Sequence, residues 1–157
     1  MPAPVVELVD LRLPPRGALM GLDLGAKTIG VAASDPDRRL ATGVETIART
    51  NFSADARRLL ALAAERKAFA FVLGLPINMD GSEGPRAQST RSFARNLARL
   101  TELPIAFWDE RLSTAAVERE LIAANARRDK RKAVIDEHAA IFILQGALDR
   151  LRSVANL

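Results

Sequence analysis

The sequence predicts an α/β fold in which three antiparallel strands, followed by parallel strands, form one mixed sheet flanked by helices. Two short apolar runs, 18–23 and 28–34, are joined by a turn of small residues, a pattern typical of a β-hairpin. Residues 69–75 are a continuous apolar run, as expected for a strand buried on both faces of a parallel sheet. Helical patterns alternate with the later strands, which favours strand–helix units.

Length and composition limit the class of protein. A chain of 157 residues suits one domain, and 48% hydrophobic with 27% charged residues favours folding over disorder. We find no apolar run near the ~18 residues of a membrane span and no signal peptide, so we expect a cytoplasmic protein. Cysteine is absent, which excludes disulfides, thiolate metal sites and cysteine nucleophiles.

The N-terminal part divides at a proline-rich junction. Pro14-Pro15-Arg16-Gly17 separates an extension, residues 1–17, from a single domain over 18–157. Within the extension, residues 5–9 are either an edge strand or unstructured.

After the hairpin we expect a third strand over 41–47, which follows the turn signal at 35–37. Ser53 is predicted to cap a helix over 54–66.

In the second half, the strand at 69–75 is followed by a polar loop, 76–85, and a helix that reaches Leu100. The apolar stripe of that helix is predicted to consist of Phe93, Leu97 and Leu100. A short buried strand over 103–108 comes next.

The last part of the chain is predicted to be helical around a basic loop. Ser113 or Thr114 begins a helix that ends near Ala124, residues 127–132 form the loop, and a final helix covers 134–153.

Positive charge is unevenly distributed. The net charge is +4, and residues 127–132 contain five cations. Arg91, Arg95 and Arg99 recur every four residues, which places them on one stripe of a helix. Such patches suit a phosphate backbone, and the alternative is a solvated arginine-rich surface.

Acidic residues lie at three places in the predicted fold where a carboxylate is costly. Asp23 ends the first core strand, Asp109 and Glu110 end the last one, and Asp136 begins the last helix. A buried ionised carboxylate needs a partner or a cation, and the ends of strands are where α/β sheets build their sites. The structural alternatives are a turn former for Asp23 and, for Glu110, an ion pair with Arg111 or another surface arginine.

Helical periodicity gives the clearest argument for Asp136. It falls on the apolar stripe of the last helix, with Ala140, Ile143 and Ala147. The polar stripe on the opposite side consists of His138, Gln145, Asp149 and Arg152. Asp136 therefore needs a partner, unless it only complements the helix dipole. On the same reasoning His138 is an ordinary surface histidine. Trp108 is expected to fill the core rather than to stack on a base.

Together the three acids fit a site for hard divalent cations, which bind carboxylate and water oxygens. Two such ions can activate a water and stabilise the leaving oxygen of a phosphodiester. Mg²⁺ or Mn²⁺ is therefore the expected cofactor.

Four segments resemble motifs of the YqgF family. They are 21–35, 72–88, 108–114 and 130–140, and the resemblance covers nearly everything from residue 18 to residue 150. It implies a ribonuclease H-like fold similar to that of Holliday-junction resolvases. It also implies a nuclease, one that processes the 5′ end of pre-16S ribosomal RNA or resolves branched DNA. By position, Asp23, Glu110 and Asp136 match the catalytic and metal-binding acids of the family.

The expected partner is therefore a nucleic acid. Predicted contacts in the first two thirds of the chain are Lys27, Asn78, Arg86 and Arg111. Those of the basic cluster are Arg127, Arg128, Lys130, Arg131 and Lys132. For Asn78 the alternative is a hydrogen bond within its loop, and for Arg86 an ordinary surface cation.

Two questions stay open at this point. The alternative function is a non-catalytic RNA-binding assembly factor with the same fold. Such a factor would be expected to lack one of the acidic residues that bind metal, and this sequence has all three. A symmetric DNA junction would require two sites and hence a homodimer.

Overall fold

The computed structural model describes the backbone of residues 3–112 and 128–155, with side chains in the last helix described from residue 138. Its centre is a six-stranded sheet in the order β1-β6-β5-β2-β3-β4. The strands are β1 Val5–Glu7, β2 Ala18–Leu24, β3 Thr28–Ser34, β4 Ala41–Ala48, β5 Ala68–Leu75 and β6 Ile105–Asp109. The pairs β2–β3 and β3–β4 are antiparallel, and β2–β5, β5–β6 and β1–β6 are parallel. The predicted mixed α/β sheet is confirmed.

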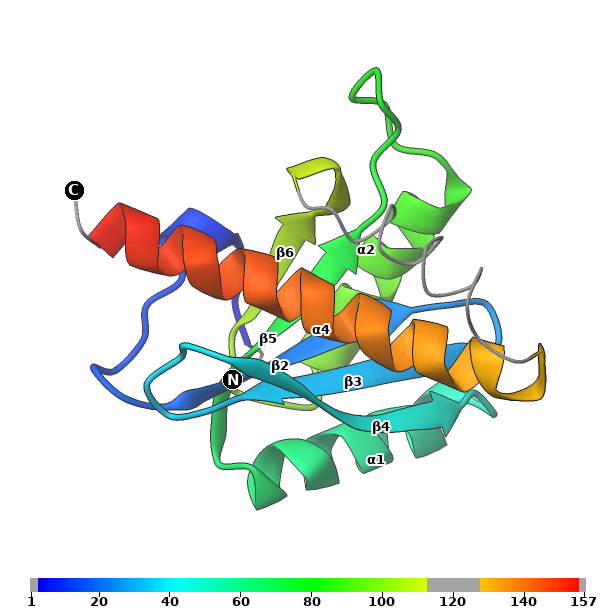
Figure 1. The fold of residues 1–157 in the computed structure, drawn as a ribbon, viewed down its shortest axis with the longest axis horizontal. Helices are drawn as coiled ribbons and strands as arrows, with labels where there is room; N and C mark the ends of the chain where they lie inside the picture. Colours follow the sequence, from blue (N-terminus) through cyan, green and yellow to red (C-terminus); the bar gives the residue numbers. More distant parts are fainter. Residues whose placement is uncertain (1–2, 113–127, 156–157) are drawn as a thin grey trace.

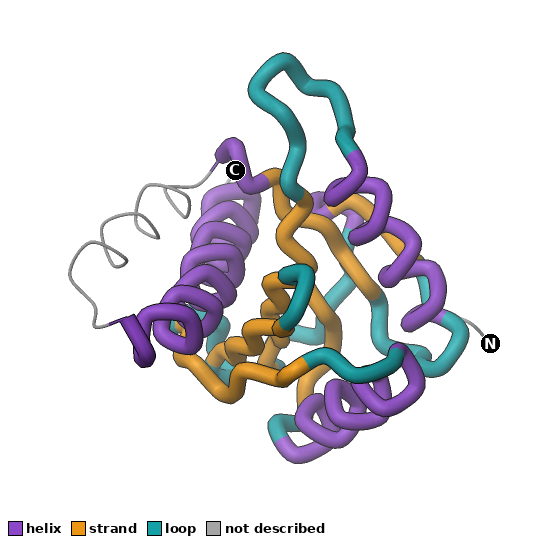
Figure 2. The backbone as a smooth tube through the Cα atoms, turned by 90° about the vertical axis from the view of Figure 1, so that its right-hand side faces the viewer, coloured by secondary structure: helices purple, strands orange, loops and turns teal. Residues whose placement is uncertain are grey.

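Helices cover both faces of this sheet (Figures 1 and 2). Helices α1 (Phe52–Glu65) and α2 (Pro85–Ala98) lie on one face, and α4 (Arg128–Ala155) crosses the other. Short 3-10 turns, η1 (Leu8–Asp10) and η2 (Glu110–Leu112), follow β1 and β6. Strand side chains alternate between two cores, so that Leu22 and Leu73 pack toward α1 and α2 while Leu19 and Val72 pack toward α4.

The N-terminal segment adds an edge strand to the sheet. Val5, Val6 and Glu7 pair in parallel with Ile105, Ala106 and Phe107. Ala3 and Leu8, on either side of the strand, are buried. Of the two alternatives for residues 5–9, the edge strand is the one found over Val5–Glu7; the division of the chain at residue 17 stays a prediction.

Two details of the helices differ from the prediction. Helix α1 begins at Phe52 because Asn51 is its N-cap: the Asn51 Oδ1 accepts a hydrogen bond from the Ala54 N–H at 2.9 Å. Asn is among the strongest N-cap residues, and it stands two positions before the predicted cap, Ser53. Helix α2 ends at Ala98, so Leu100 is 53% exposed and does not extend the buried stripe of Phe93 and Leu97.

The basic cluster is not a loop over its described part. Helix α4 begins at Arg128 and runs through residue 132, which extends the predicted helix of 134–153 at its N-terminus. Arg and Lys are good helix formers, and the cluster contains no proline or glycine to stop a helix. The helix predicted from residue 113 or 114 to 124 lies outside the described residues. No helix in the described part of the chain is long and apolar enough to cross a membrane.

Candidate active site

The carboxyl ends of β2, β5 and β6 meet at one edge of the sheet, and Asp23 lies there. It is the sixth residue of β2, pairs in register with Gly30 of β3, and is only 7% exposed. Its neighbours Leu22 and Leu24 pack toward α1 and α2. Because strand residues alternate, Asp23 is on the face that α4 covers.

A glycine in β5 allows the Glu110 side chain to lie at the same end of the sheet as Asp23. Leu22 pairs with Leu73, so Gly74 of β5 lies beside Asp23 in the parallel register. A Cβ added at Gly74 would lie 3.3 Å from the carboxyl carbon of Glu110 and 2.4 Å from Ile143 Cδ1 of α4. The missing side chain thus makes room for the Glu110 carboxyl group and for α4. The structure therefore brings Asp23 and Glu110 to one end of the sheet, on its α4 face.

Asp136 belongs to the helix that packs there. Its backbone lies in α4, seven residues before Ile143, which is about 10 Å along the helix axis. Its side chain lies outside the described residues. The side chains that are described contain no group of three or more histidine, cysteine or acidic residues able to hold a metal.

The donors at this edge fit a hard divalent cation. Both described acids offer only oxygen ligands, and Gly74 lets the Glu110 carboxyl group approach β5 closely. The chain has no cysteine, and its one histidine is His138 in α4. This chemistry favours Mg²⁺-like ions over soft metals.

Arg111 is held by the residue two positions before it. Its guanidinium pairs with Asp109, with Nη2 2.8 Å from Oδ2. The side-chain hydrogen bonds from Arg111 hold the pKa of Asp109 below its usual value. Arg111, the partner named in the structural alternative for Glu110, thus binds Asp109.

The loop between β5 and α2 extends beyond the sheet (Figure 2). Asn78 donates from its side chain to Ser82 Oγ at 3.0 Å and from its backbone to the Ser82 carbonyl at 2.9 Å. Asp80 accepts two hydrogen bonds from Ser82, which lower the pKa of Asp80. The structural alternative for Asn78, a hydrogen bond within its loop, is therefore present.

The remaining predicted contacts are scattered around the edge. Lys27 is exposed in the β2–β3 turn, and Arg86 is exposed in the first turn of α2. Residues 128 and 130–132 are in the first turns of α4 with side chains not described, and Arg127 lies outside the described residues. In the α2 stripe, Arg91 pairs with Glu83 and lies over the Phe107 ring, 5.0 Å from its centroid.

Trp108 is a core residue, as predicted. It is 6% exposed and packs against Gly146 of α4, where an added Cβ would lie 2.8 Å from its ring. His138 is half-buried, and its ring lies 6.2 Å from that of Phe142.

Sequence reasoning missed two residues next to the site. Gly74 interrupts a run of large apolar residues, and a glycine inside a strand often marks the close approach of another group. Arg49 follows β4, and its guanidinium donates to the Gly25 carbonyl in the turn after Asp23 at 2.6 Å. Nothing in the sequence around Arg49 indicates that contact.

Comparison with known proteins gives one family. The family model described as RuvX, Holliday junction resolvase, matches residues 17–150. A protein of Rhodopseudomonas palustris strain TIE-1 is 76% identical over 98% of both chains, and one of Bradyrhizobium sp. strain ORS 278 is 74% identical over 98% of this chain and 97% of its own. Both are named, provisionally, pre-16S rRNA nuclease.

Among solved structures, Thermus thermophilus RuvC in complex with a Holliday junction substrate superposes with a TM-score of 0.54. The match covers 87% of this chain and 97% of that one at 10% sequence identity. This likeness confirms the predicted ribonuclease H-like architecture.

Proposed function

We propose a nuclease site for this chain, which belongs to the RuvX (YqgF) family of Holliday junction resolvases. The proposed site consists of Asp23, Glu110 and Asp136. The observation that carries the proposal is the meeting of Asp23 and Glu110 across Gly74, on the face covered by the helix that contains Asp136. These are the three acids that the family motifs select.

The three carboxylates would hold one or two divalent cations, for which Mg²⁺ or Mn²⁺ suits the all-oxygen donors. Such ions, when bound, supply activation of water and charge stabilisation at the leaving oxygen of a phosphodiester. The chain's own contribution is placement. Asp23 is fixed by two neighbouring strands, and Glu110 by the turn that directly follows β6.

Cationic residues around this edge would bind the phosphates on either side of the cleaved bond. Lys27 lies in the turn that follows Asp23, and Arg111 directly follows Glu110. Asp109 orients the Arg111 guanidinium and leaves part of it available, since a guanidinium has five N–H donors. The basic residues at the start of α4, Arg128, Lys130, Arg131 and Lys132, would extend the contact along the strand, together with the preceding Arg127.

We propose the 5′ region of pre-16S ribosomal RNA as the substrate, which the names of the close relatives support. For that role we propose the cytoplasm as the location of the protein. A second candidate is branched DNA, supported by the family description and by the junction bound to the RuvC neighbour. A symmetric junction would require a homodimer with two sites.

The test compares cleavage of a pre-16S leader RNA, a four-way DNA junction and a single-stranded DNA, with Mg²⁺, Mn²⁺ or EDTA. We expect cleavage that depends on the metal and is abolished by Asp23→Asn, because the amide removes a charged ligand. The matched control is Asp149→Asn, an acid on an exposed part of α4. Circular dichroism checks that each variant is folded.

Two results would contradict the proposal. Cleavage by a folded Asp23→Asn protein at the wild-type rate would exclude the acidic site. Tight RNA binding by the wild type, with no cleavage of any substrate in either metal, would favour the non-catalytic assembly factor.

A further inference from the structure

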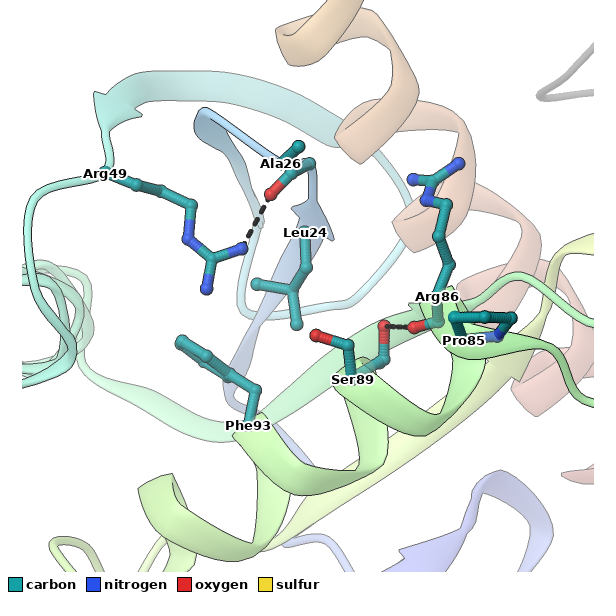
Figure 3. A pocket seen from close by; sticks show the side chains of 9 residues that line it. Leu24, Ala26, Arg49, Pro85, Arg86, Ser89 and Phe93 are labelled. Carbon is teal, nitrogen blue, oxygen red and sulfur yellow. Dashed lines mark hydrogen bonds between the residues drawn. The ribbon is translucent and has the colours of Figure 1, made fainter.

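A pocket of about 230 Å³ lies on the other side of the strand end that carries Asp23 (Figure 3). It is bounded by the β2–β3 turn, by Arg49 after β4, and by the first turns of α2. Leu24, which directly follows Asp23, lines it. Since successive strand residues face opposite sides of a sheet, the acids and this pocket flank the same strand end.

Two arginines border the pocket from opposite sides, Arg49 from the strand side and Arg86 from α2 (Figure 3). The bond to the Gly25 carbonyl and the Phe93 ring, 5.7 Å away, hold the Arg49 guanidinium in place. That bond uses one of the five N–H donors of Arg49. Arg86 is exposed, so its head group can adjust to a ligand.

These arginines differ from their neighbours in charge balance. On the same face of the sheet, Arg58 is neutralised by Glu45 and Arg91 by Glu83. Neither Arg49 nor Arg86 forms an ion pair with any residue that the structure describes. The first turn of α2 contains no acidic residue, and its partial positive charge adds to theirs. The pocket thus has an uncompensated cationic rim.

The floor of the pocket is apolar. Leu24 and Phe93 form it between Arg49 and α2, and the hydroxyl of Ser89 points into it (Figure 3). Pro85 lines the pocket at the start of α2, next to Arg86. An apolar floor beneath a cationic rim suits a ligand with a flat or aliphatic body and an anionic end. The volume is below the ~300–1,000 Å³ of common small-molecule sites, so one such unit fits rather than two.

We propose that this pocket, the Arg49 pocket, holds one nucleotide of the substrate strand beside the cleaved phosphodiester. Its phosphate lies between Arg49 and Arg86, and its sugar and base lie against Leu24 and Pro85. The inference rests on the proposed function for the identity of the strand. Beyond that function, we infer that the nucleic-acid strand passes over the β2–β3 turn, beside the exposed Lys27, to reach the opposite face of the sheet.

The test measures binding without metal, in EDTA, so that it does not depend on cleavage. The probe is a short, fluorescently labelled single-stranded RNA, followed by anisotropy over a series of salt concentrations. Arg86→Gln removes half of the cationic rim, and Ser89→Trp fills the pocket. The matched control is Arg57→Gln, an exposed arginine of α1 outside the pocket.

We expect Arg86→Gln to weaken binding about tenfold, as for loss of a charged hydrogen bond, and to lower the salt slope by about one. Ser89→Trp should weaken binding by a similar factor, and Arg57→Gln should leave it within about twofold, as expected for a surface residue away from the contact. In a two-dimensional amide spectrum, AMP should shift the signals of residues 25, 26 and 86–89 in the wild type and not in Ser89→Trp.

Other outcomes overturn the inference. Wild-type RNA binding by both Arg86→Gln and Ser89→Trp would exclude a strand in this pocket. Equal shifts with inorganic phosphate and with AMP would reduce the pocket to an anion site without a nucleotide. If AMP binds here but no substrate is cleaved, the pocket stands and the nuclease site fails, so the two failures are distinguishable.

Discussion

Gly74 provides a direct test of how the acidic site is constructed. A methyl group at this position would meet Ile143 Cδ1 at 2.4 Å, Ile143 Cγ1 at 3.0 Å and Glu110 Cδ at 3.3 Å. We therefore expect Gly74→Ala to disturb the packing of α4 and, separately, to displace the Glu110 carboxyl group. The two effects can be measured independently, as stability and as activity.

The contacts of the added methyl group determine the expected loss of folding stability. Inserting a methyl group into a packed core costs about 1–3 kcal/mol, while replacing glycine by alanine within a strand returns about 0.5–1 kcal/mol of backbone entropy. These ranges differ by about 0–2.5 kcal/mol. Because the 2.4 Å contact with Ile143 is far below van der Waals distance, we expect a net loss of about 1–2 kcal/mol, which for a chain of this size lowers Tm by roughly 2–8 °C. The Glu110 carboxyl group must also move by a few tenths of an ångström. Metal sites tolerate about ±0.2 Å, so metal-dependent cleavage should fall as well.

A double-mutant cycle separates the two effects. Ile143→Val removes Cδ1, the atom in closest contact, and alone costs about 0.5–1.5 kcal/mol. The double variant Gly74→Ala/Ile143→Val should lose less stability than the sum of the two single variants, by about 0.5 kcal/mol or more. Its cleavage should stay low, because the contact with Glu110 remains. The assays are thermal denaturation and metal-dependent cleavage of the leader RNA.

Two results would refute this reasoning. A Gly74→Ala protein with wild-type Tm and wild-type cleavage would show that the glycine is not needed for close approach. Strictly additive losses in the cycle would show that Ile143 is not the residue that resists the methyl group.

Two further predictions concern stability alone. Asn51→Ala should cost about 0.5–2 kcal/mol, because the N-cap bond to Ala54 is lost, whereas Ser53→Ala should change the denaturation midpoint little; equal losses would contradict the assignment of the cap. Hydrogen bonds from Arg111 and Arg58 hold the pKa values of Asp109 and Glu45 below their usual 3.8 and 4.5. The stability that these depressed pKa values contribute is complete above those usual values and is lost as pH falls through the lower folded values. Tm should thus decline in that acidic range, and less steeply in Asp109→Asn/Glu45→Gln; parallel curves for the two proteins would exclude the linkage.

Much of the fold is predictable because its signals are local. The run that becomes β5 is continuously apolar, and the hairpin of β2 and β3 has its small-residue turn, so both are found where expected. The start of α1 is misplaced because Asn51 and Ser53 are both good caps, and only the hydrogen bond to Ala54 distinguishes them. The start of α4 is misplaced because dense positive charge suggests a solvated loop, although Arg and Lys favour helices.

The site is predictable only in part. The cost of a carboxylate at a strand end selects Asp23 and the pair Asp109 and Glu110, and the resemblance to the family motifs selects Glu110 from that pair. The structure places Asp23 and Glu110 at the same end of the sheet. The sequence does not predict the pairing of Arg111 with Asp109, because Asp109 and Glu110 are adjacent and only the side-chain geometry determines which of them Arg111 binds. The Arg49 pocket joins residues from three separate parts of the chain, so no local pattern could indicate it.

The close contact between α4 and the sheet also sets the helix's lengthwise position. Leu144 of α4 packs against Gly21, and Ile143 packs against Gly74. A shift of α4 by one residue along its axis would therefore bring one of its side chains into collision with a strand. The backbone of residue 136 lies two turns from Ile143, at a distance along the axis that these glycines fix. The packing of α4 in the hydrophobic core thus sets where the backbone of Asp136 lies along the sheet.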